Sequence, residues 1–134
     1  MKIVISGSYK QISQLEKVAN DLCQLGFETQ APVRSDYTVG DNERRRKLMD
    51  EHLSFIKNCD AFIVGNVKEP NEKYGRVGNS TYFETGCAYI LGKPIFSLYG
   101  IDPESNFAED LLALNVIVLD KNYKKLKLKE SKKI

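Results

Sequence analysis

The sequence predicts an α/β fold built around a doubly wound parallel sheet. Short apolar segments rich in β-branched residues alternate with longer segments in which apolar residues recur at helical spacing. That alternation is typical of repeated strand–helix–strand units, whose strands run parallel. The apolar segments are nearly continuous, as expected of strands that are buried on both faces. Five such strands arrange most simply in the flavodoxin-like order 2-1-3-4-5, with helices on both faces.

Local signals set the expected boundaries of the strands and helices. The first strand covers residues 2–6, and the helix after it carries an apolar stripe that Gly26 ends. Residues 32–41 form a polar loop, after which Asp41 or Asn42 can cap the second helix. The other strands are expected over residues 27–31, 61–65, 95–99 and 116–119, a short helix over 108–114, and a weak edge strand over 126–129.

The chain of 134 residues is long enough for one domain, which would bury roughly two-thirds of its unfolded surface. We place this domain at residues 1–120 and a basic tail at residues 121–134. The tail holds seven lysines and one glutamate, a net charge of +6, so the rest of the chain carries −4. Lysines can bind nucleic acid, but no nucleic-acid-binding module accompanies these, and a solvated terminus is the commoner case. We therefore expect no nucleic-acid partner.

Composition also argues against membrane, metal and cofactor sites. No apolar run approaches the roughly 20 residues that span a bilayer, and the N-terminal apolar segment is too short for a signal peptide. Cys23, Cys59 and Cys87 are odd in number and far apart, so we expect reduced core residues of a cytoplasmic protein. With a single histidine and neither a Gly-x-Gly-x-x-Gly nor a Walker motif, the sequence predicts no metal and no cofactor.

The most informative stretch covers residues 74–96. A glycine-rich loop leads into a segment of helical spacing, which ends at Gly92 and Pro94. An expected strand lies on each side, and ligands of such units bind where the carboxyl ends of the strands meet the N-terminus of the helix. One apolar stripe of this helix comprises Phe83, Gly86, Cys87, Ile90 and Leu91.

Glu84, in the first turn expected for this helix, has two interpretations. A carboxylate beside a loop that favours anions is a candidate for chemistry. The segment Thr81-Tyr82-Phe83-Glu84 also fits a capping box, in which Glu84 bonds the backbone N–H of Thr81. The two roles exclude each other, because a carboxylate turned back to its own cap is poorly aimed at a substrate. Spacing alone leaves both open.

Polar residues at the ends of two expected strands are further candidates. The turn Ser6-Gly7-Ser8-Tyr9 can hold a phosphate or a sugar, or it can be an ordinary turn in which Ser8 caps a helix. Asn66 follows the third strand, at a rim position from which its side chain would face a ligand. Neither pattern decides between binding and plain structure.

The second helix adds a histidine and a basic cluster. His52 lies within the apolar stripe, so a partly buried structural histidine is favoured over a catalytic one. The cluster over residues 44–47 fits a solvated face paired with Asp50 and Glu51. A phosphate clamp at a shared interface is the other interpretation of the cluster.

The motif Gly78-x-Ser80-Thr81-x-x-Glu84-x-Gly86-x-Ala88, followed by Gly92-Lys93-Pro94, resembles the central segment of the nucleoside 2-deoxyribosyltransferase-like family. That family includes the 2′-deoxynucleoside 5′-phosphate N-hydrolases. The resemblance extends over most of residues 1–99, and the opening strand followed by Ser6-Gly7-Ser8 is similar as well.

The resemblance implies an enzyme that cleaves N-glycosidic bonds or transfers a 2-deoxyribosyl group, with a nucleoside or nucleotide as substrate. The family's glutamate at this position is its nucleophile, which places that role on Glu84 and implies a covalent glycosyl-enzyme. Members often assemble as dimers or larger, with a neighbour that completes the site, so a homo-oligomer is implied too. The substrate-binding residues implied are Ser6, Gly7, Ser8, Tyr9, Asn66, Gly78, Asn79 and Ser80.

Two positions depart from the transferase pattern. The transferases carry an aspartate at the end of the third strand, where this chain has Asn66, and another six positions before the glutamate, where it has Gly78. An aspartate can pass a proton to the departing base, whereas an asparagine can only form hydrogen bonds. The alternative hypothesis is therefore a non-catalytic module of the same fold that binds or senses a nucleotide.

Overall fold

The sheet has the predicted strand order. The computed structural model describes residues 1–33 and 38–131, and side chains through Lys127. All neighbouring strands pair in parallel, in the order β2-β1-β3-β4-β5. The predicted flavodoxin-like order 2-1-3-4-5 is therefore confirmed. The strands are β1 (Lys2–Ser6), β2 (Glu28–Gln30), β3 (Ala61–Val64), β4 (Ile95–Ser97) and β5 (Ile117–Val118).

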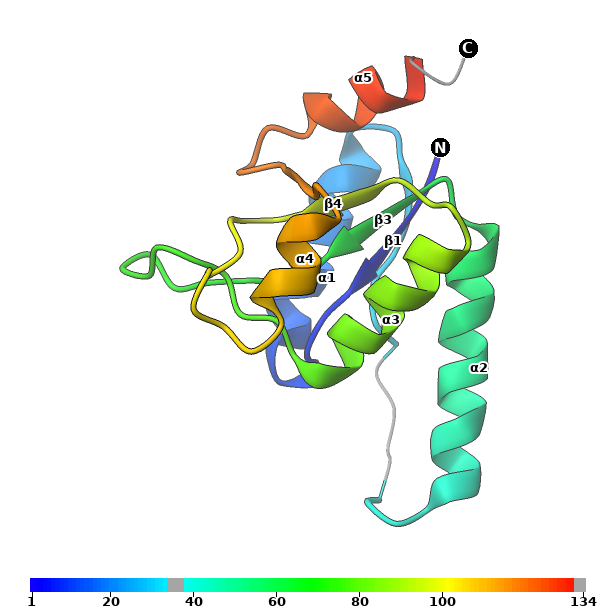
Figure 1. The fold of residues 1–134 in the computed structure, drawn as a ribbon. Coiled ribbons are helices and arrows are strands. Elements are labelled where there is room, and N and C mark those ends of the chain that lie inside the picture. Colours follow the sequence, from blue (N-terminus) through cyan, green and yellow to red (C-terminus); the bar gives the residue numbers. More distant parts are fainter. Residues whose placement is uncertain (34–37, 132–134) are drawn as a thin grey trace.

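Helices cover both faces of this sheet (Figure 1). One face carries η1 (Tyr9–Gln11), α1 (Ile12–Gln24) and α5 (Lys124–Ser131). The other carries α2 (Asn42–Asn58), α3 (Asn79–Ile90) and α4 (Ala108–Ala113). In Figure 1 the N-terminal half of α2 extends beyond the sheet, while its C-terminal end lies beside it.

Each face of the sheet has its own hydrophobic core. On the α1 side, inward residues of the strands pack with Leu15 and Leu22 of α1 and with Leu126 of α5. On the α2 side, Ile56 and Ala88 pack against the other set of strand residues. Both faces of the central strands are buried, which explains their continuous apolar sequence, and each fully buried Leu or Ile contributes about 1.5–3 kcal/mol.

The expected edge strand over residues 126–129 is wrong. These residues lie in α5, whose Leu126 is fully buried while Tyr123, three residues earlier, packs against the same core. Lys125 donates a hydrogen bond to the carbonyl oxygen of Val118 at 2.6 Å, and the ammonium group of Lys127 lies 5.9 Å from the ring centre of Phe27. Tyr123 and Leu126 thus pack on the core, although both lie within the expected basic tail of residues 121–134.

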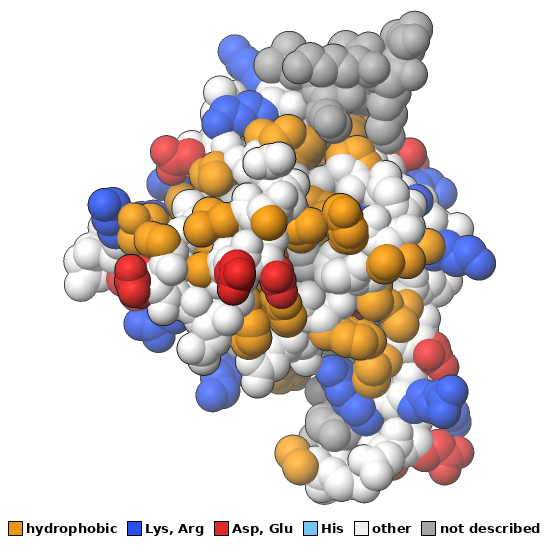
Figure 2. All heavy atoms as spheres, in the orientation of Figure 1, with side chains coloured by type: hydrophobic (Ala, Val, Ile, Leu, Met, Phe, Trp, Pro, Cys, Tyr) orange, Lys and Arg blue, Asp and Glu red, His pale blue; other side chains and the backbone are white. Residues whose placement is uncertain are grey.

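The apolar stripe of α3 does not face the core. Phe83, Ile90 and Leu91 are 51 %, 83 % and 44 % exposed, whereas the residues buried against the sheet are Thr81, Thr85 and Ala88. The small residues allow close approach, and the hydroxyl of Thr85 is satisfied by the carbonyl oxygen of Thr81 at 2.7 Å. Figure 2 shows hydrophobic side chains gathered on the surface that α3 and α4 present.

The cysteines are free, as expected, but they differ in burial. Cys59 is buried and Cys87 is partly buried, whereas Cys23 is exposed on α1, so the prediction of a core residue is wrong there. Leu22 occupies the core side of that helix turn instead. None of the described helices is both long and apolar enough to cross a membrane. Residence in the cytoplasm stays a prediction.

Candidate active site

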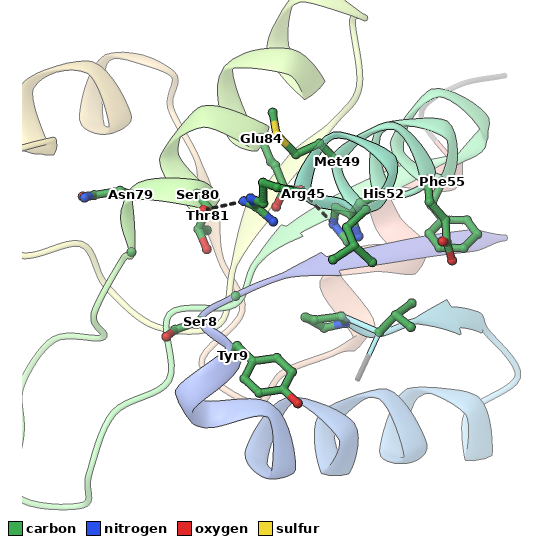
Figure 3. Close-up of a pocket in the computed structure, with 16 residues that line it drawn as sticks. Ser8, Tyr9, Arg45, Met49, His52, Phe55, Asn79, Ser80, Thr81 and Glu84 are labelled. Atoms are coloured by element: carbon green, nitrogen blue, oxygen red, sulfur yellow. Dashed lines mark hydrogen bonds and ion pairs between the residues drawn. The ribbon is translucent and has the colours of Figure 1, made fainter. Parts of the chain in front are cut away.

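A cavity of about 290 Å³ lies at the carboxyl end of β1, between the turn after β1, helix α2 and the first turns of α3 (Figure 3). Seven residues of the predicted site line it: Gly7, Ser8, Tyr9, Gly78, Asn79, Ser80 and Glu84. Nine further lining residues were not predicted as site residues: Pro32, Val33, Arg45, Leu48, Met49, Glu51, His52, Phe55 and Thr81.

Glu84 points into this cavity and does not cap its own helix. Helix α3 begins at Asn79 with Gly78 as its N-cap, so Thr81 lies inside the helix and the capping-box interpretation is wrong. The hydroxyl of Ser6 donates a hydrogen bond to Oε1 of Glu84. Oε2 lies 3.4 Å from Nε2 of His52, and Figure 3 shows the two side chains directed at each other. With 17 % of its side chain exposed, Glu84 is oriented yet accessible.

The turn after β1 positions Ser6 and Ser8 differently. Ser6 is fully buried, and it acts on Glu84 without lining the cavity. A Cβ atom at Gly7 would lie 2.5 Å from Cδ1 of Leu15, so any larger residue would force the buried Leu15 side chain to shift. Ser8 accepts a hydrogen bond from the backbone N–H of Lys10 at 3.4 Å, which confirms it as the cap of η1, and it also lines the cavity.

Helix α2 forms the opposite wall. Its N-cap is Asp41, which accepts a hydrogen bond from the N–H of Arg44 at 3.1 Å. Of the two predicted caps, Asp41 and Asn42, the structure has the first. One turn further, Nη2 of Arg45 donates to the hydroxyl of Ser80 at 3.1 Å, across the mouth of the cavity (Figure 3). The basic cluster therefore contributes one cation, that of Arg45, to the cavity wall, whereas the sequence favoured a solvated face for the whole cluster.

His52 follows on the same face of α2. Its side chain is 12 % exposed, and its ring packs edge-on against Phe55 with the ring centres 6.3 Å apart. Nε2 is buried and has no hydrogen-bond partner among the described residues. The expected partial burial is confirmed, but the histidine lines a polar cavity next to Glu84 rather than an apolar core.

Asn66 does not face a ligand, contrary to the expectation. Its side chain is fully buried and is not among the residues that line the cavity. Nδ2 donates to the carbonyl oxygens of Tyr99 at 2.7 Å and Gly100 at 3.3 Å, and Oδ1 accepts from the N–H groups of Leu98 at 2.9 Å and Tyr99 at 3.2 Å. Asn66 thus ties the end of β3 to the end of β4. A Cβ atom at Gly75 would collide with the backbone of Asn66, so this glycine also serves packing.

The charges around Glu84 restrict the chemistry of its neighbours. Burial, and then the negative charge of Glu84, raise the pKa of the Cys87 thiol on the same helix. Cys87 is therefore held as a thiol, which is a weaker nucleophile than a thiolate. Within the described ranges, no group of three or more His, Cys, Asp or Glu side chains could hold a metal ion.

Comparison with known proteins points to enzymes that act on nucleosides and nucleotides. No protein-family model and no curated protein matches the sequence. A 2-deoxyribosyltransferase of Bacillus psychrosaccharolyticus is similar in structure with a TM-score of 0.57 and 25 % identity, over 82 % of this chain and 81 % of that one. The CMP N-glycosidase of Clostridium botulinum gives a TM-score of 0.58 and 22 % identity, over 96 % and 98 %.

A third similar structure is a 2-deoxyribosyltransferase of Leishmania mexicana, with a TM-score of 0.52 and 22 % identity over 73 % of this chain. The match spans 63 % of that longer protein, just under two-thirds of its length. Together the three likenesses establish a shared fold, and they support the nucleoside 2-deoxyribosyltransferase-like family that the central motif resembles.

Proposed function

We propose that this chain is an enzyme of the nucleoside 2-deoxyribosyltransferase-like family, which cleaves the N-glycosidic bond of a nucleoside or nucleotide with Glu84 as nucleophile. The observation that carries this proposal is the placement of Glu84. Its carboxylate reaches the cavity at the carboxyl end of β1, with one oxygen held by Ser6 and the other facing His52. The similar enzymes act on N-glycosidic bonds or transfer 2-deoxyribosyl groups, which supports the same general reaction here.

The reaction follows from a carboxylate held in this way. Glu84 attacks the anomeric carbon while the nucleobase departs, through a transition state with oxocarbenium character, and a glycosyl-enzyme ester results. Water then releases the sugar, or a second base accepts it. The Ser6 hydrogen bond fixes the direction of attack, so that orientation is established before the substrate arrives.

The cavity wall divides into an apolar and a polar part. Leu48, Met49 and Phe55 of α2 offer apolar surface suited to a flat base or the face of a sugar. Ser80 and Arg45 offer hydrogen-bond donors suited to a sugar hydroxyl or a 5′-phosphate. We therefore expect a nucleoside or its 5′-monophosphate as substrate. A dry apolar wall would favour transfer over hydrolysis.

Release of the base tests the proposal directly. Purified protein is incubated with a panel of deoxynucleosides and their 5′-monophosphates, alone and with a second free base, and chromatography separates the bases and nucleosides. The matched variants are Glu84→Gln and Glu109→Gln, the latter at an exposed position of α4. Release or exchange that survives in Glu109→Gln and disappears in Glu84→Gln supports the proposal, whereas turnover by Glu84→Gln at the wild-type rate refutes it.

The second candidate function is a nucleotide-binding or sensing module without catalysis. It is favoured by Gly78 and Asn66, which supply no carboxylate where the transferases have aspartates. Such a module would show a rise in melting temperature with a nucleotide and no product after long incubation. Any base release above that of a protein-free control excludes it.

We also propose that the chain forms a homo-oligomer, as the family resemblance implies. The described surface that fits a subunit contact is the exposed apolar part of α3 and α4, which includes Phe83, Ile90 and Leu112. Light scattering after gel filtration would give at least twice the monomer mass. We expect Phe83→Ser combined with Ile90→Ser to lower that mass, because charged or polar residues at an interface core disfavour association. A monomeric wild type would contradict the proposal.

A further inference from the structure

We propose that His52 is the proton-transfer residue of this site, which protonates the departing base and then recovers the proton from the attacking water. This inference rests on the proposed function, and it assigns to α2 the role that neither Asn66 nor Gly78 can fill. Both polar atoms of the Asn66 side chain form hydrogen bonds with the backbone of residues 98–100, and Gly78 has no side chain.

The first ground is the state of the His52 ring. Nε2 is buried and makes no hydrogen bond to the described residues, although Oε2 of Glu84 lies within ion-pair distance at 3.4 Å and the cavity contains other polar groups. A buried polar atom that makes no hydrogen bond is unfavourable, so its position calls for an explanation beyond packing. A substrate in the cavity could supply a hydrogen-bond partner for Nε2.

The second ground is the match between histidine and the reaction. A base that departs from a sugar needs a proton, and a group that gives and takes one near neutral pH has an ordinary pKa close to 7, as histidine does. The charged and titratable groups that share the cavity with His52 are Glu84 from α3, Tyr9 from η1, and Arg45 and Glu51 from its own helix. Among these, Glu84 lies within ion-pair distance of the ring, with Oε2 3.4 Å from Nε2.

The proton balance closes over one turnover. In the first step an oxygen of Glu84 bonds to the anomeric carbon, the carbon–nitrogen bond breaks, and the electron pair stays on the base, which takes the proton from Nε2. In the second step a water oxygen bonds to the anomeric carbon, the ester bond to Glu84 breaks, and Nε2 accepts the proton of the water. The products are the free sugar and the free base, and both side chains return to their starting states.

The resting geometry implies a small movement. Glycosidases that form a covalent intermediate hold their two catalytic carboxyl groups about 5–5.5 Å apart, and we expect a similar separation for Glu84 and His52 when the sugar is bound. Nε2 of His52 and Oε2 of Glu84 are 3.4 Å apart in the structure. The imidazole therefore withdraws by about 2 Å when the sugar enters, a displacement that a side-chain rotation supplies.

A leaving group that needs no proton separates this role from simple positioning of Glu84. The substrates are the best deoxynucleoside or 5′-monophosphate from the panel and the matching 4-nitrophenyl 2-deoxyriboside, whose nitrophenolate departs unprotonated. The variants are His52→Gln and, as a control on the same helix, Asp50→Asn, which is exposed and outside the cavity. Circular dichroism and thermal unfolding confirm that each variant is folded.

For His52→Gln we expect kcat on the natural substrate to fall about 10²–10⁴-fold. With the nitrophenyl substrate we expect a rapid burst of one nitrophenolate per site and then slow turnover, because attack no longer needs the proton but release by water does. Azide, a nucleophile that needs no base, should restore the turnover. Asp50→Asn should behave as the wild type.

Several outcomes overturn the inference. If His52→Gln slows the first turnover equally on both substrates, His52 is a positioning residue only. If kcat of His52→Gln is unchanged, His52 has no part in the mechanism. In both cases, loss of base release in Glu84→Gln still upholds the proposed function. No base release by the wild type ends both proposals. If His52→Gln does not fold, the first-turnover rate of the wild type is measured against pH on both substrates. A rate that falls at high pH with the natural substrate but not with the nitrophenyl substrate supports proton transfer by His52. An equal fall with both substrates refutes it.

Discussion

The carboxyl edge of the sheet has two halves that look alike in sequence and differ in structure. Above β1, the polar groups of Glu84 and His52 turn into a cavity and keep hydrogen-bonding capacity. Above β3 and β4, Asn66 is fully buried, and both its polar atoms are bonded to backbone. A polar residue at a strand end is thus a site candidate only when its hydrogen bonds are left open. The closed half holds the strands in place, and the open half is available for a substrate.

The largest contrast is expected between activity and stability at Glu84. Glu84→Gln keeps the shape of the side chain and a hydrogen bond to Ser6, but it removes the nucleophile, so kcat should fall by about 10⁴-fold or more. The melting temperature should change little, because the side chain is not part of either core. Steady-state base release measures the change in kcat, and thermal unfolding measures the change in melting temperature. A large fall in melting temperature would show that Glu84, like Asn66, mainly stabilises the fold.

The reverse contrast is expected at Asn66. In Asn66→Asp a carboxylate oxygen replaces the N–H donor that now faces the carbonyl oxygens of Tyr99 and Gly100. Two donor contacts become repulsive in a buried place, so the free energy of unfolding should fall by about 3 kcal/mol. Urea unfolding measures it. A variant that is equally stable and more active would show that Asn66 belongs to the open half after all.

Ser6 lies on the border of the two halves, and a moderate effect is expected there. Ser6→Ala removes the hydrogen bond to Oε1 and leaves the carboxylate free to rotate. We expect kcat to fall about 10-fold to 100-fold, because orientation is lost while the nucleophile remains. The KM should stay nearly constant, since the buried Ser6 side chain does not line the cavity. A change confined to KM would mean that Ser6 contacts the substrate.

The smallest effect is expected at the mouth of the open half. Arg45→Ala should raise the KM for 5′-monophosphates about 10-fold, the value of one charge-assisted contact, and leave the KM for nucleosides unchanged. Its guanidinium bonds Ser80, one of the first residues of α3, where a phosphate would meet backbone N–H groups. Steady-state kinetics of Arg45→Ala and the wild type, on nucleosides and on 5′-monophosphates, measures the change in KM for each class. Equal changes for both classes would show that Arg45 only shapes the wall.

The sheet and its order were predictable because their signals are local. Apolar strands such as residues 61–64 are bounded by polar residues or glycine, and parallel pairing follows from the helices between them. Predicted residues such as Ser8 and Gly78 line the cavity because the end of a strand and the start of a helix fix the position of their backbone. The direction of a side chain is a tertiary property, so the roles of Asn66 and His52 could not be read from spacing.

The α3 stripe shows the same limit for packing. Helical spacing groups Phe83 with Ile90, yet the sheet accepts the narrower face with Thr85 and Ala88, because small residues let the helix lie close. The periodicity of apolar residues tells that a helix has an apolar face, and it does not tell which surface that face meets. The stripe that helical spacing groups together is therefore the exposed face of α3, and the face packed on the sheet is the one with Thr85 and Ala88.

The construction of α2 has a consequence for how the site opens. Its C-terminal end is anchored by Ile56 and Cys59 in the core, whereas the half that carries Arg45 extends away from the sheet and has no fully buried residue. Local unwinding should therefore start at Asn42 and stop near Ile56, at a free energy far below that of global unfolding. Amide hydrogens should exchange along this helix in a gradient, fast at Arg44 and slow at Lys57. One wall of the cavity can thus fray and reform while the sheet, with Ser6 and the strand ends, stays intact.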